Sequence, residues 1–385
     1  MKINIVAEYL PLKNFIKEYS EKNITGKYRP VAVGRYGIRT RESIYSKELA
    51  KDYSKNKLIY KNTLTVGMGS VQIDIGILTD DNIYSVSPAY HTYKINGIDG
   101  NYLRYCLQSC NKDMFERFVV KSARQGKSID FKRWLDYKIP VYNETTQRFI
   151  VDYLNKVLKL TNLYNKQLSH LDDLVKARFV EMFGDLENNT KGWYIQQLEE
   201  LCKISSSKRI YRKEQSDFGV PFLRIADLMD KINNGITKSE LFISAEKYNE
   251  LCLLGLVPKK GDILLTARGT LGKCYIIQND DKFYFQDGMI TWLSDFSNNI
   301  TALFLKYLFS TDWLQKQITE LQAGSTVAYL SIAMTKKLYI PLPPIKLQNE
   351  FAEFVKQIDK SKFAVQQAKE NAQLLFDSLM QKYFG

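Results

Sequence analysis

Residues 339–345 read YIPLPPI, and 201 positions earlier residues 138–144 read KIPVYNE. A Phe-Gly pair ends the segment that follows each string, at 183–184 and again at 384–385. One offset that covers matches so far apart requires few net insertions between the copies. We therefore predict a tandem chain in which a globular domain and a long helix are followed by a second domain and a second helix.

The repeat divides the chain into a first domain at 1–143, a long helix at 144–184, a second domain at 185–344 and a C-terminal long helix at 345–385. Each domain mixes short strands with helices, which predicts an α+β fold class. Each helix would be about 60 Å long at 1.5 Å per residue. We expect two similar globular domains joined by two antiparallel coiled-coil helices, with the domains at opposite ends of a rod and a pseudo-twofold axis across it. The alternative is that each helix packs only on its own domain.

Apolar residues in both long segments recur at alternating steps of four and three, which is a heptad pattern. Asn143 is a candidate N-cap of the first helix, and Gly184 is the expected C-terminal stop. Prolines at 343 and 344 suit the start of the second helix. The residues predicted to pack the helices together are Ile150, Leu154, Val157, Leu168 and Leu171 in the first, and Phe351, Val355, Ile358, Val365 and Phe376 in the second.

The bulk composition indicates a two-domain protein outside the membrane. The chain has 385 residues, of which 45% are hydrophobic, and this is enough for two cores. No apolar run approaches the roughly 18 residues of a membrane span, and the N-terminus lacks a signal-peptide core. We expect a cytoplasmic protein. Five cysteines and two histidines, His91 and His170, give no metal-ligand spacing, so no metal site is predicted.

Positive charge is concentrated in the first domain. The chain carries a net +13, and residues 1–143 hold 24 Lys and Arg against 14 Asp and Glu, a net +10. Residues 185–344 hold 19 against 18, a net +1. A basic domain favours a nucleic-acid partner over an acidic protein or a membrane surface. The second domain must therefore bind through local clusters.

Basic residues also gather with glycines and aromatics at 34–41, 121–128 and 206–213, and polar residues gather at 323–329. Arginine suits guanine edges and phosphates, and glycine permits close approach of the backbone. The alternative for each cluster is an ordinary solvated loop. The residues predicted to bind DNA are Arg35, Tyr36, Arg39, Arg41, Arg124, Gln125, Lys127, Lys208, Arg209, Tyr211, Arg212, Arg268, Lys273, Ser325, Thr326 and Tyr329.

Motifs for catalysis are missing from the sequence. It contains no P-loop, no dinucleotide glycine fingerprint and no Asn/Asp-Pro-Pro-aromatic tetrad for amino-group methylation. The glycines at 269 and 272 are in the wrong order for a nucleotide loop, and we interpret this turn as one that brings Arg268 close to a phosphate. No catalytic residue and no cofactor site is predicted.

The chain resembles the specificity subunit of type I restriction–modification enzymes. The resemblance rests on YIPLPPI followed by Gln348 and a terminal KYFG, on IPV at 139–141 followed by Gln147, and on FGD at 183–185. Trp193 ahead of PFLRI at 221–225 is similar to the start of a target recognition domain. The resemblance covers nearly all of the 385 residues.

The resemblance implies a subunit without catalytic activity, whose two target recognition domains each read one half of a bipartite DNA sequence. The helices would set the spacer between the half-sites and bind two modification (methyltransferase) subunits. S-adenosylmethionine, ATP and Mg²⁺ would be held by the partner subunits, and restriction subunits would add translocation and cleavage. The weak net charge of the second domain departs from this expectation. The competing hypotheses are a fused methyltransferase or nuclease, and a coiled-coil scaffold with protein-binding heads.

Overall fold

The computed structural model describes residues 6–34, 37–43, 52–122, 126–322 and 328–385. The chain forms two compact units. Unit 1 comprises Met1–Lys166 and Val365–Gly385, and unit 2 comprises Gln167–Ala364. Each unit therefore contains a globular domain together with one half of each long helix.

Unit 1 is built on a four-stranded antiparallel sheet of order β2-β9-β6-β7. Its strands are β2 (Ile16–Tyr19), β9 (His91–Ile95), β6 (Thr63–Met68) and β7 (Ile73–Ile77). The helices that follow are α1 (Gly100–Ser109), α2 (Asn111–Phe118) and α3 (Phe131–Trp134). Four strand pairs complete the unit: β1 (Glu8–Pro11) with β12 (Lys138–Val141), β3 (Val31–Gly34) with β4 (Gly37–Thr40), β5 (Lys57–Ile59) with β8 (Tyr84–Val86), and β10 (Val119–Ser122) with β11 (Gly126–Ile129).

Unit 2 repeats this plan with a sheet of order β14-β21-β18-β19. Its strands are β14 (Lys203–Ser205), β21 (Ile290–Ser294), β18 (Ile263–Thr266) and β19 (Cys274–Ile276). The helices are α7 (Ala302–Leu308), α8 (Asp312–Leu321) and α9 (Ile332–Lys336), and β13 (Tyr194–Gln197) pairs with β22 (Tyr339–Leu342). An added subdomain contains β15 (Gln215–Ser216), β16 (Val220–Leu223), β17 (Phe242–Ile243), β20 (Tyr284–Phe285), α5 (Ile225–Asn234) and α6 (Ala245–Leu253).

The two units share their element order from the sheet to the end of the second helix. α3, β12 and the first long helix each begin 201 residues before α9, β22 and the second long helix. The repeat and the α+β fold class predicted from the sequence are confirmed. Between the corresponding sheet strands unit 1 carries β3, β4, β5 and β8, whereas the added subdomain of unit 2 also carries the helices α5 and α6, so the described parts of the two copies differ in this region.

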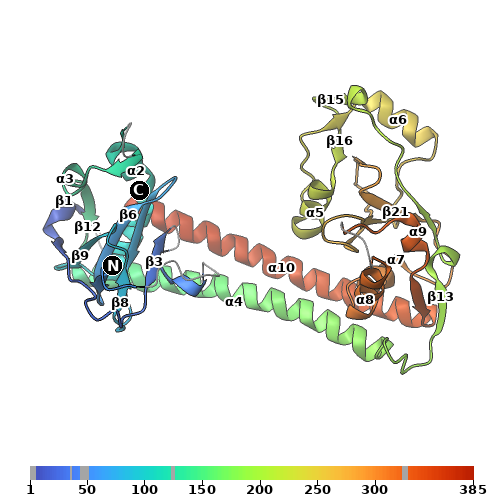
Figure 1. The fold of residues 1–385 in the computed structure, drawn as a ribbon, viewed down its shortest axis with the longest axis horizontal. Coiled ribbons are helices and arrows are strands. Elements are labelled where there is room, and N and C mark those ends of the chain that lie inside the picture. The colour runs from blue at the N-terminus through green and yellow to red at the C-terminus, as the bar shows by residue number, and fades with distance from the viewer. Residues whose placement is uncertain (1–5, 35–36, 44–51, 123–125, 323–327) are drawn as a thin grey trace. The chain divides into compact units, whose positions relative to one another are not determined.

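The long helices are α4 (Glu144–Phe183) and α10 (Ile345–Phe384), and they run antiparallel (Figure 1). In unit 1 the start of α4 meets the end of α10, where the Tyr142 hydroxyl donates to the carbonyl of Tyr383. In unit 2 the end of α4 meets the start of α10, and the rings of Phe183 and Phe351 lie 5.5 Å apart. Each half-helix also packs on the globular domain of its own unit. The predicted antiparallel packing of the two helices is confirmed, and the contact of each half-helix with a globular domain adds to it.

The residues predicted to pack the two long helices together, called the seam below, are largely buried. Leu168, Leu171 and Phe376 are half-buried. The sequence pattern missed Phe179 and Phe183, which join the core of unit 2 beside Phe304 of α7. The predicted seam residues that are buried are Ile150, Leu154, Val157, Phe351, Val355, Ile358 and Val365.

A buried glutamine connects each long helix to the helix that follows the sheet. In unit 1 the side chain of Gln147 accepts a hydrogen bond from the Asp99 backbone N–H (3.0 Å) and donates to the Tyr142 carbonyl (2.7 Å). Asp99 is the N-cap of α1, so the glutamine fixes the start of α1 against the start of α4.

The same arrangement recurs in unit 2. Gln348 accepts from the N–H of Thr301, the N-cap of α7, at 2.9 Å. It donates to the carbonyls of Asn299 (2.8 Å) and Pro343 (2.9 Å). Gln348 is 0% exposed, and every polar atom of its side chain is used. The repeated glutamine is therefore a structural part of the domain–helix junction.

Candidate nucleic-acid interface

Six of the predicted DNA-binding residues lie outside the described residues, and they stay predictions. These are Arg35, Tyr36, Arg124, Gln125, Ser325 and Thr326. The remaining ten belong to strands, short 3-10 helices and loops of the two globular domains, and the structure brings some of them together.

The end of β18 forms one such meeting point in unit 2. Arg268, just after the strand, makes an isolated backbone bridge with Tyr329, and its guanidinium lies 5.1 Å from the centre of that ring. Backbone hydrogen bonds join Ala267 to Met289 and Leu330 to Ala267, both at 2.9 Å. Two predicted residues that are 61 positions apart thus form a cation–π pair on an exposed corner, hereafter corner 2.

A second basic side chain of corner 2 is Arg209, on the loop after β14. Its Nε donates to the carboxylate of Asp287 at 2.8 Å. Asp287 precedes Gly288 and Met289, and Met289 contacts Ala267 at the base of the corner. This hydrogen bond and the negative charge of Asp287 raise the pKa of Arg209 above its ordinary value. Corner 2 therefore presents two fixed guanidiniums.

Lys273 lies across the glycine turn from Arg268. Thr266 Oγ1 closes this turn, donating to the Thr270 carbonyl (2.5 Å) and accepting from the Lys273 N–H (2.9 Å). Gly269 and Gly272 have φ of +70° and +75°, which favours glycine over other residues. The turn leaves the Lys273 side chain exposed.

The other three predicted residues of unit 2 lie toward the added subdomain. The ammonium of Lys208 is 3.8 Å from Glu250 of α6. Tyr211 and Arg212 are exposed, and the Tyr211 N–H is capped by Glu214 at 3.0 Å. These residues extend the basic segment away from corner 2 and do not join it directly.

Corner 1 is the equivalent region of unit 1, where the end of β6 meets β11. The Lys127 ammonium donates to the Ser70 carbonyl at 2.6 Å and lies 5.4 Å from the centre of the Phe115 ring. Gly67 occupies the position of Arg268 in the repeat, and a Cβ there would come within 2.4 Å of the Tyr90 ring. Each unit thus places a cation over an aromatic ring at this end of its sheet.

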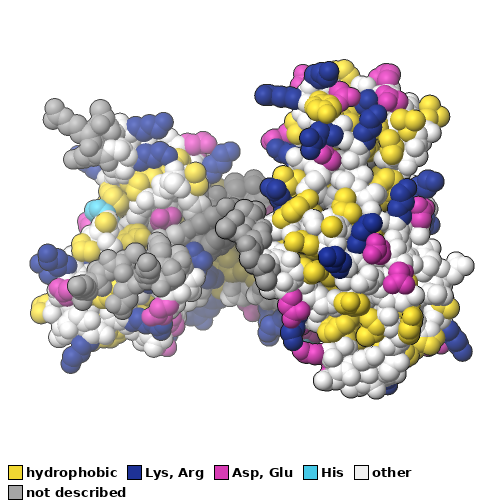
Figure 2. All heavy atoms as spheres, turned by 45° about the vertical axis from the view of Figure 1, so that its right-hand side comes forward, with side chains coloured by type: hydrophobic (Ala, Val, Ile, Leu, Met, Phe, Trp, Pro, Cys, Tyr) yellow, Lys and Arg dark blue, Asp and Glu magenta, His cyan; other side chains and the backbone are white. Residues whose placement is uncertain are grey.

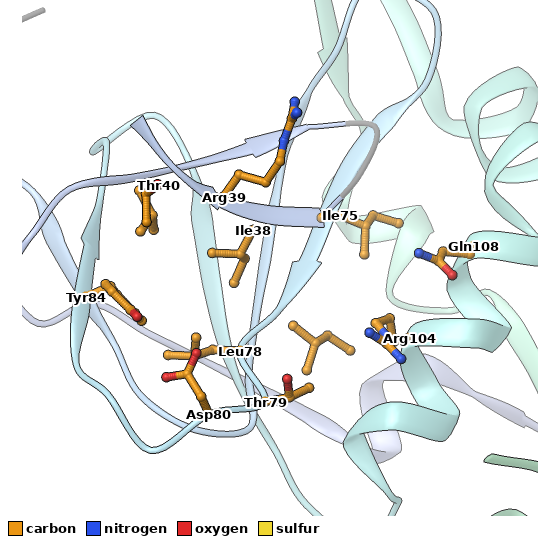
Figure 3. Close-up of a pocket in the computed structure, with 13 residues that line it drawn as sticks. Ile38, Arg39, Thr40, Ile75, Leu78, Thr79, Asp80, Tyr84, Arg104 and Gln108 are labelled. Atoms are coloured by element: carbon orange, nitrogen blue, oxygen red, sulfur yellow. The ribbon is translucent and has the colours of Figure 1, made fainter. Parts of the chain in front are cut away.

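The other two described residues of unit 1 flank this region. Arg41 lies 5.4 Å from the centre of the Tyr53 ring and lines a cavity of about 270 Å³ beside Gly67 and Tyr90. Arg39 is exposed on β4, and Figure 3 shows its side chain extending away from a second cavity of about 300 Å³. Arg104 of α1 lies on the far side of that cavity.

The charge on unit 2 agrees with its nearly balanced composition. On the visible face of this unit in Figure 2, Lys and Arg side chains are interspersed with Asp and Glu and do not form one continuous basic patch. Binding of a polyanion by this unit would therefore depend on individual residues such as those of corner 2. Among the described residues, no group of His, Cys, Asp and Glu could hold a metal ion, and none of the helices is long and apolar enough to span a membrane.

The sequence analysis does not include Asp287 of corner 2, and it includes Ser206 in the cluster at 206–213 without predicting that it binds DNA. Ser206 accepts a hydrogen bond from the Gly288 N–H at 3.2 Å and so fixes the loop that carries Asp287. Asp287 is 78 residues from Arg209, and an acidic residue would not be selected by a search for basic clusters. A search for acids that could pair with clustered arginines would have included it among many others.

A family model and two curated relatives indicate the class of protein that this chain is similar to. Residues 190–375, which span the domain of unit 2 and most of α10, match the type I restriction modification DNA specificity domain. A putative type I restriction enzyme specificity subunit from Haemophilus influenzae is 28% identical over 188 residues, which is 49% of this chain and 45% of that protein. The MjaVIII specificity subunit of Methanocaldococcus jannaschii is 27% identical over 286 residues, covering 68% of this chain and 64% of that protein.

Over these regions the chain is similar to the specificity subunits of type I restriction–modification enzymes. The matched regions span about half to two thirds of the length of these curated relatives.

Solved structures agree in fold. The type I restriction–modification S subunit from M. genitalium aligns over 100% of this chain and 98% of its own, with a TM-score of 0.54 and 16% identity. A chain from a structure on complex assembly and conformational transition of the type I R-M system aligns over 100% and 99%, with a TM-score of 0.61 and 14% identity.

Proposed function

We propose that this protein is the non-catalytic DNA-recognition subunit of a type I restriction–modification complex. Each globular domain binds one half of a bipartite site in double-stranded DNA. The long helices set the spacer between the half-sites and bind two modification subunits. The observation that carries this proposal is the duplication itself: two domains of one plan, each joined to the same helix pair by the same buried glutamine.

The exposed corners support a role in DNA binding. At corner 2 the guanidinium of Arg268 lies over the Tyr329 ring, and Arg209 forms an ion pair with Asp287. At corner 1 the ammonium of Lys127 lies over the Phe115 ring. A guanidinium held in a fixed direction suits the guanine edge or a phosphate, because its donors form a rigid fork. Phosphate contacts would place each domain on the duplex, and a few base contacts would decide the sequence.

Catalysis is assigned to partner subunits. In this proposal the modification subunits hold S-adenosylmethionine and methylate the target adenine, and restriction subunits use ATP and Mg²⁺ for translocation and cleavage. The chain itself holds no cofactor and acts in the cytoplasm, where its DNA lies. The sequence supports this division because it carries no methyltransferase tetrad and no P-loop.

The test is to express the chain with its modification subunits in a host free of DNA methylation and to sequence the methylated genome. The proposal predicts a single methylated motif made of two specified half-sites. The chain expressed without modification subunits should leave the genome unmethylated. Methylation by the isolated chain would support the fused-enzyme alternative. A complex that forms but has no sequence preference would support the scaffold alternative.

A further inference from the structure

We propose that Arg209 recognises a guanine in the half-site bound by unit 2, and that Asp287 is the positioning residue that aims it. This inference rests on the proposed function, because it assigns one base contact within DNA recognition by this unit. Sequence reasoning selected Arg209 only as one member of a basic cluster, and Asp287 was not selected at all.

Hydrogen bonds of the residues on both sides of Asp287 hold its backbone in place. The N–H of Gln286 donates to the Leu223 carbonyl at 2.9 Å. On the other side the Gly288 N–H is bound by Ser206, and the Met289 carbonyl is bound by the N–H of Ala267. The Asp287 side chain is only 20% exposed. Its position is therefore set by the fold of unit 2 and not by the arginine.

The backbone of Arg209 is anchored as well. The N–H of the preceding residue, Lys208, donates to the hydroxyl of Tyr284 at 2.8 Å, and Tyr284 is fully buried. The following residue, Ile210, is 7% exposed. The Arg209 side chain itself is 66% exposed. An exposed arginine between two anchored residues is pre-organised, so less side-chain entropy is lost when it binds a ligand.

The geometry of the pair leaves a two-donor edge for the ligand. Arg209 uses Nε for Asp287, and the two terminal amino groups of the guanidinium project from the same plane. Two parallel donors match the O6 and N7 acceptors of guanine in the major groove, which is the commonest specific contact of arginine with DNA. Adenine offers a donor where guanine has O6, so it would lose one of these bonds.

Charge favours a base over a phosphate as the ligand. Arg209 and Asp287 form a neutral pair, which contributes little to the attraction of a polyanion and would place a carboxylate near the backbone phosphates. Arg268, which rests on an uncharged ring, has no such counter-charge in its cation–π contact. We therefore assign the base contact to Arg209 and the phosphate contact to Arg268.

The experiment is methylome sequencing of the complex assembled with three variants. Arg209→Gln removes the two terminal donors of the guanidinium, and Asp287→Asn keeps the shape of the positioning residue but removes its charge. Lys203→Ala is the control, because it removes an exposed positive charge from β14, the strand that precedes the Arg209 loop. We expect Arg209→Gln to relax one guanine position of the motif, with discrimination lowered about 10- to 100-fold. Asp287→Asn should relax the same position, and the double variant should be no worse than Arg209→Gln alone. Lys203→Ala should keep every position of the motif.

Three results would overturn this assignment. The motif could stay intact in Arg209→Gln, or the two variants could relax different positions. Binding could also weaken uniformly across sequences with a salt slope reduced by about one, which is the signature of a phosphate contact. In each of these cases the wild-type complex still methylates a bipartite motif, so the proposed function stands. A wild-type complex without any motif would instead refute the proposed function.

Discussion

Replacing Gln348 by methionine should loosen the junction between α10 and the domain of unit 2. Methionine fills a similar volume but makes none of the three hydrogen bonds to Thr301, Asn299 and Pro343. A buried polar group left without a partner costs about 1–3 kcal/mol, and part of this is recovered where water can enter. We expect a loss of about 4 kcal/mol in the free energy of unfolding of unit 2. Gln147→Met, which breaks two bonds in unit 1, should cost about 2–3 kcal/mol.

The assay is urea unfolding followed by circular dichroism, with hydrogen exchange to assign each transition to a unit. Gln348→Met should lower only the unit 2 transition and should speed exchange of the Thr301 amide, whose acceptor is lost. The control is Gln373→Met on α10, where the glutamine is exposed and donates a hydrogen bond to Asp377 one turn away. This control should change stability by less than about 0.5 kcal/mol. A loss below about 1 kcal/mol in Gln348→Met, with Thr301 still protected, would refute the structural role of the glutamine.

Three further outcomes are expected. Lys231→Met should destabilise the added subdomain by about 3–5 kcal/mol, because it leaves the carboxylate of Asp281, which is 6% exposed, without its cation. Urea unfolding measures this loss, and Lys238→Met, at an exposed site, is the control. Gly219→Ala should lower the melting temperature, since φ is +129° and the new Cβ would lie 2.4 Å from the Ile243 carbonyl oxygen; an unchanged melting temperature contradicts the geometry. Arg268→Ala should weaken binding of the assembled complex to DNA and reduce the magnitude of its salt slope by about one, as titrations at several salt concentrations would show.

The sequence determined the architecture well because the repeat and the heptads are local or periodic signals. The predicted first residue of each long helix, at 144 and 345, coincides with the observed start of α4 and α10. The prediction of the seam residues was less complete than that of the helix bounds. Phe179 and Phe183 were missed because they pack mainly on α7 and α10 within unit 2, and such tertiary packing leaves no fixed spacing in the sequence.

The candidate interface was less predictable than the fold. Arg268 and Tyr329 were each selected from separate clusters, but their contact depends on how β18 meets the segment before α9. Asp287 could not be selected, because its role arises only from the hydrogen bonds that fix its loop. Basic clusters indicate where DNA can bind, whereas the residues that aim an arginine come from anywhere in the chain.

The claim that the helices set the half-site spacing is tested most directly by lengthening them. Seven residues, one heptad, would be inserted between Lys166 and Gln167 of α4 and between Ala364 and Val365 of α10, where the two units divide. Both helices would grow by about 10 Å while the apolar seam keeps its face. Methylome sequencing of this variant should show the original half-sites separated by about three additional base pairs, at about 3.4 Å each. The original spacer in a complex that still methylates DNA would contradict the account.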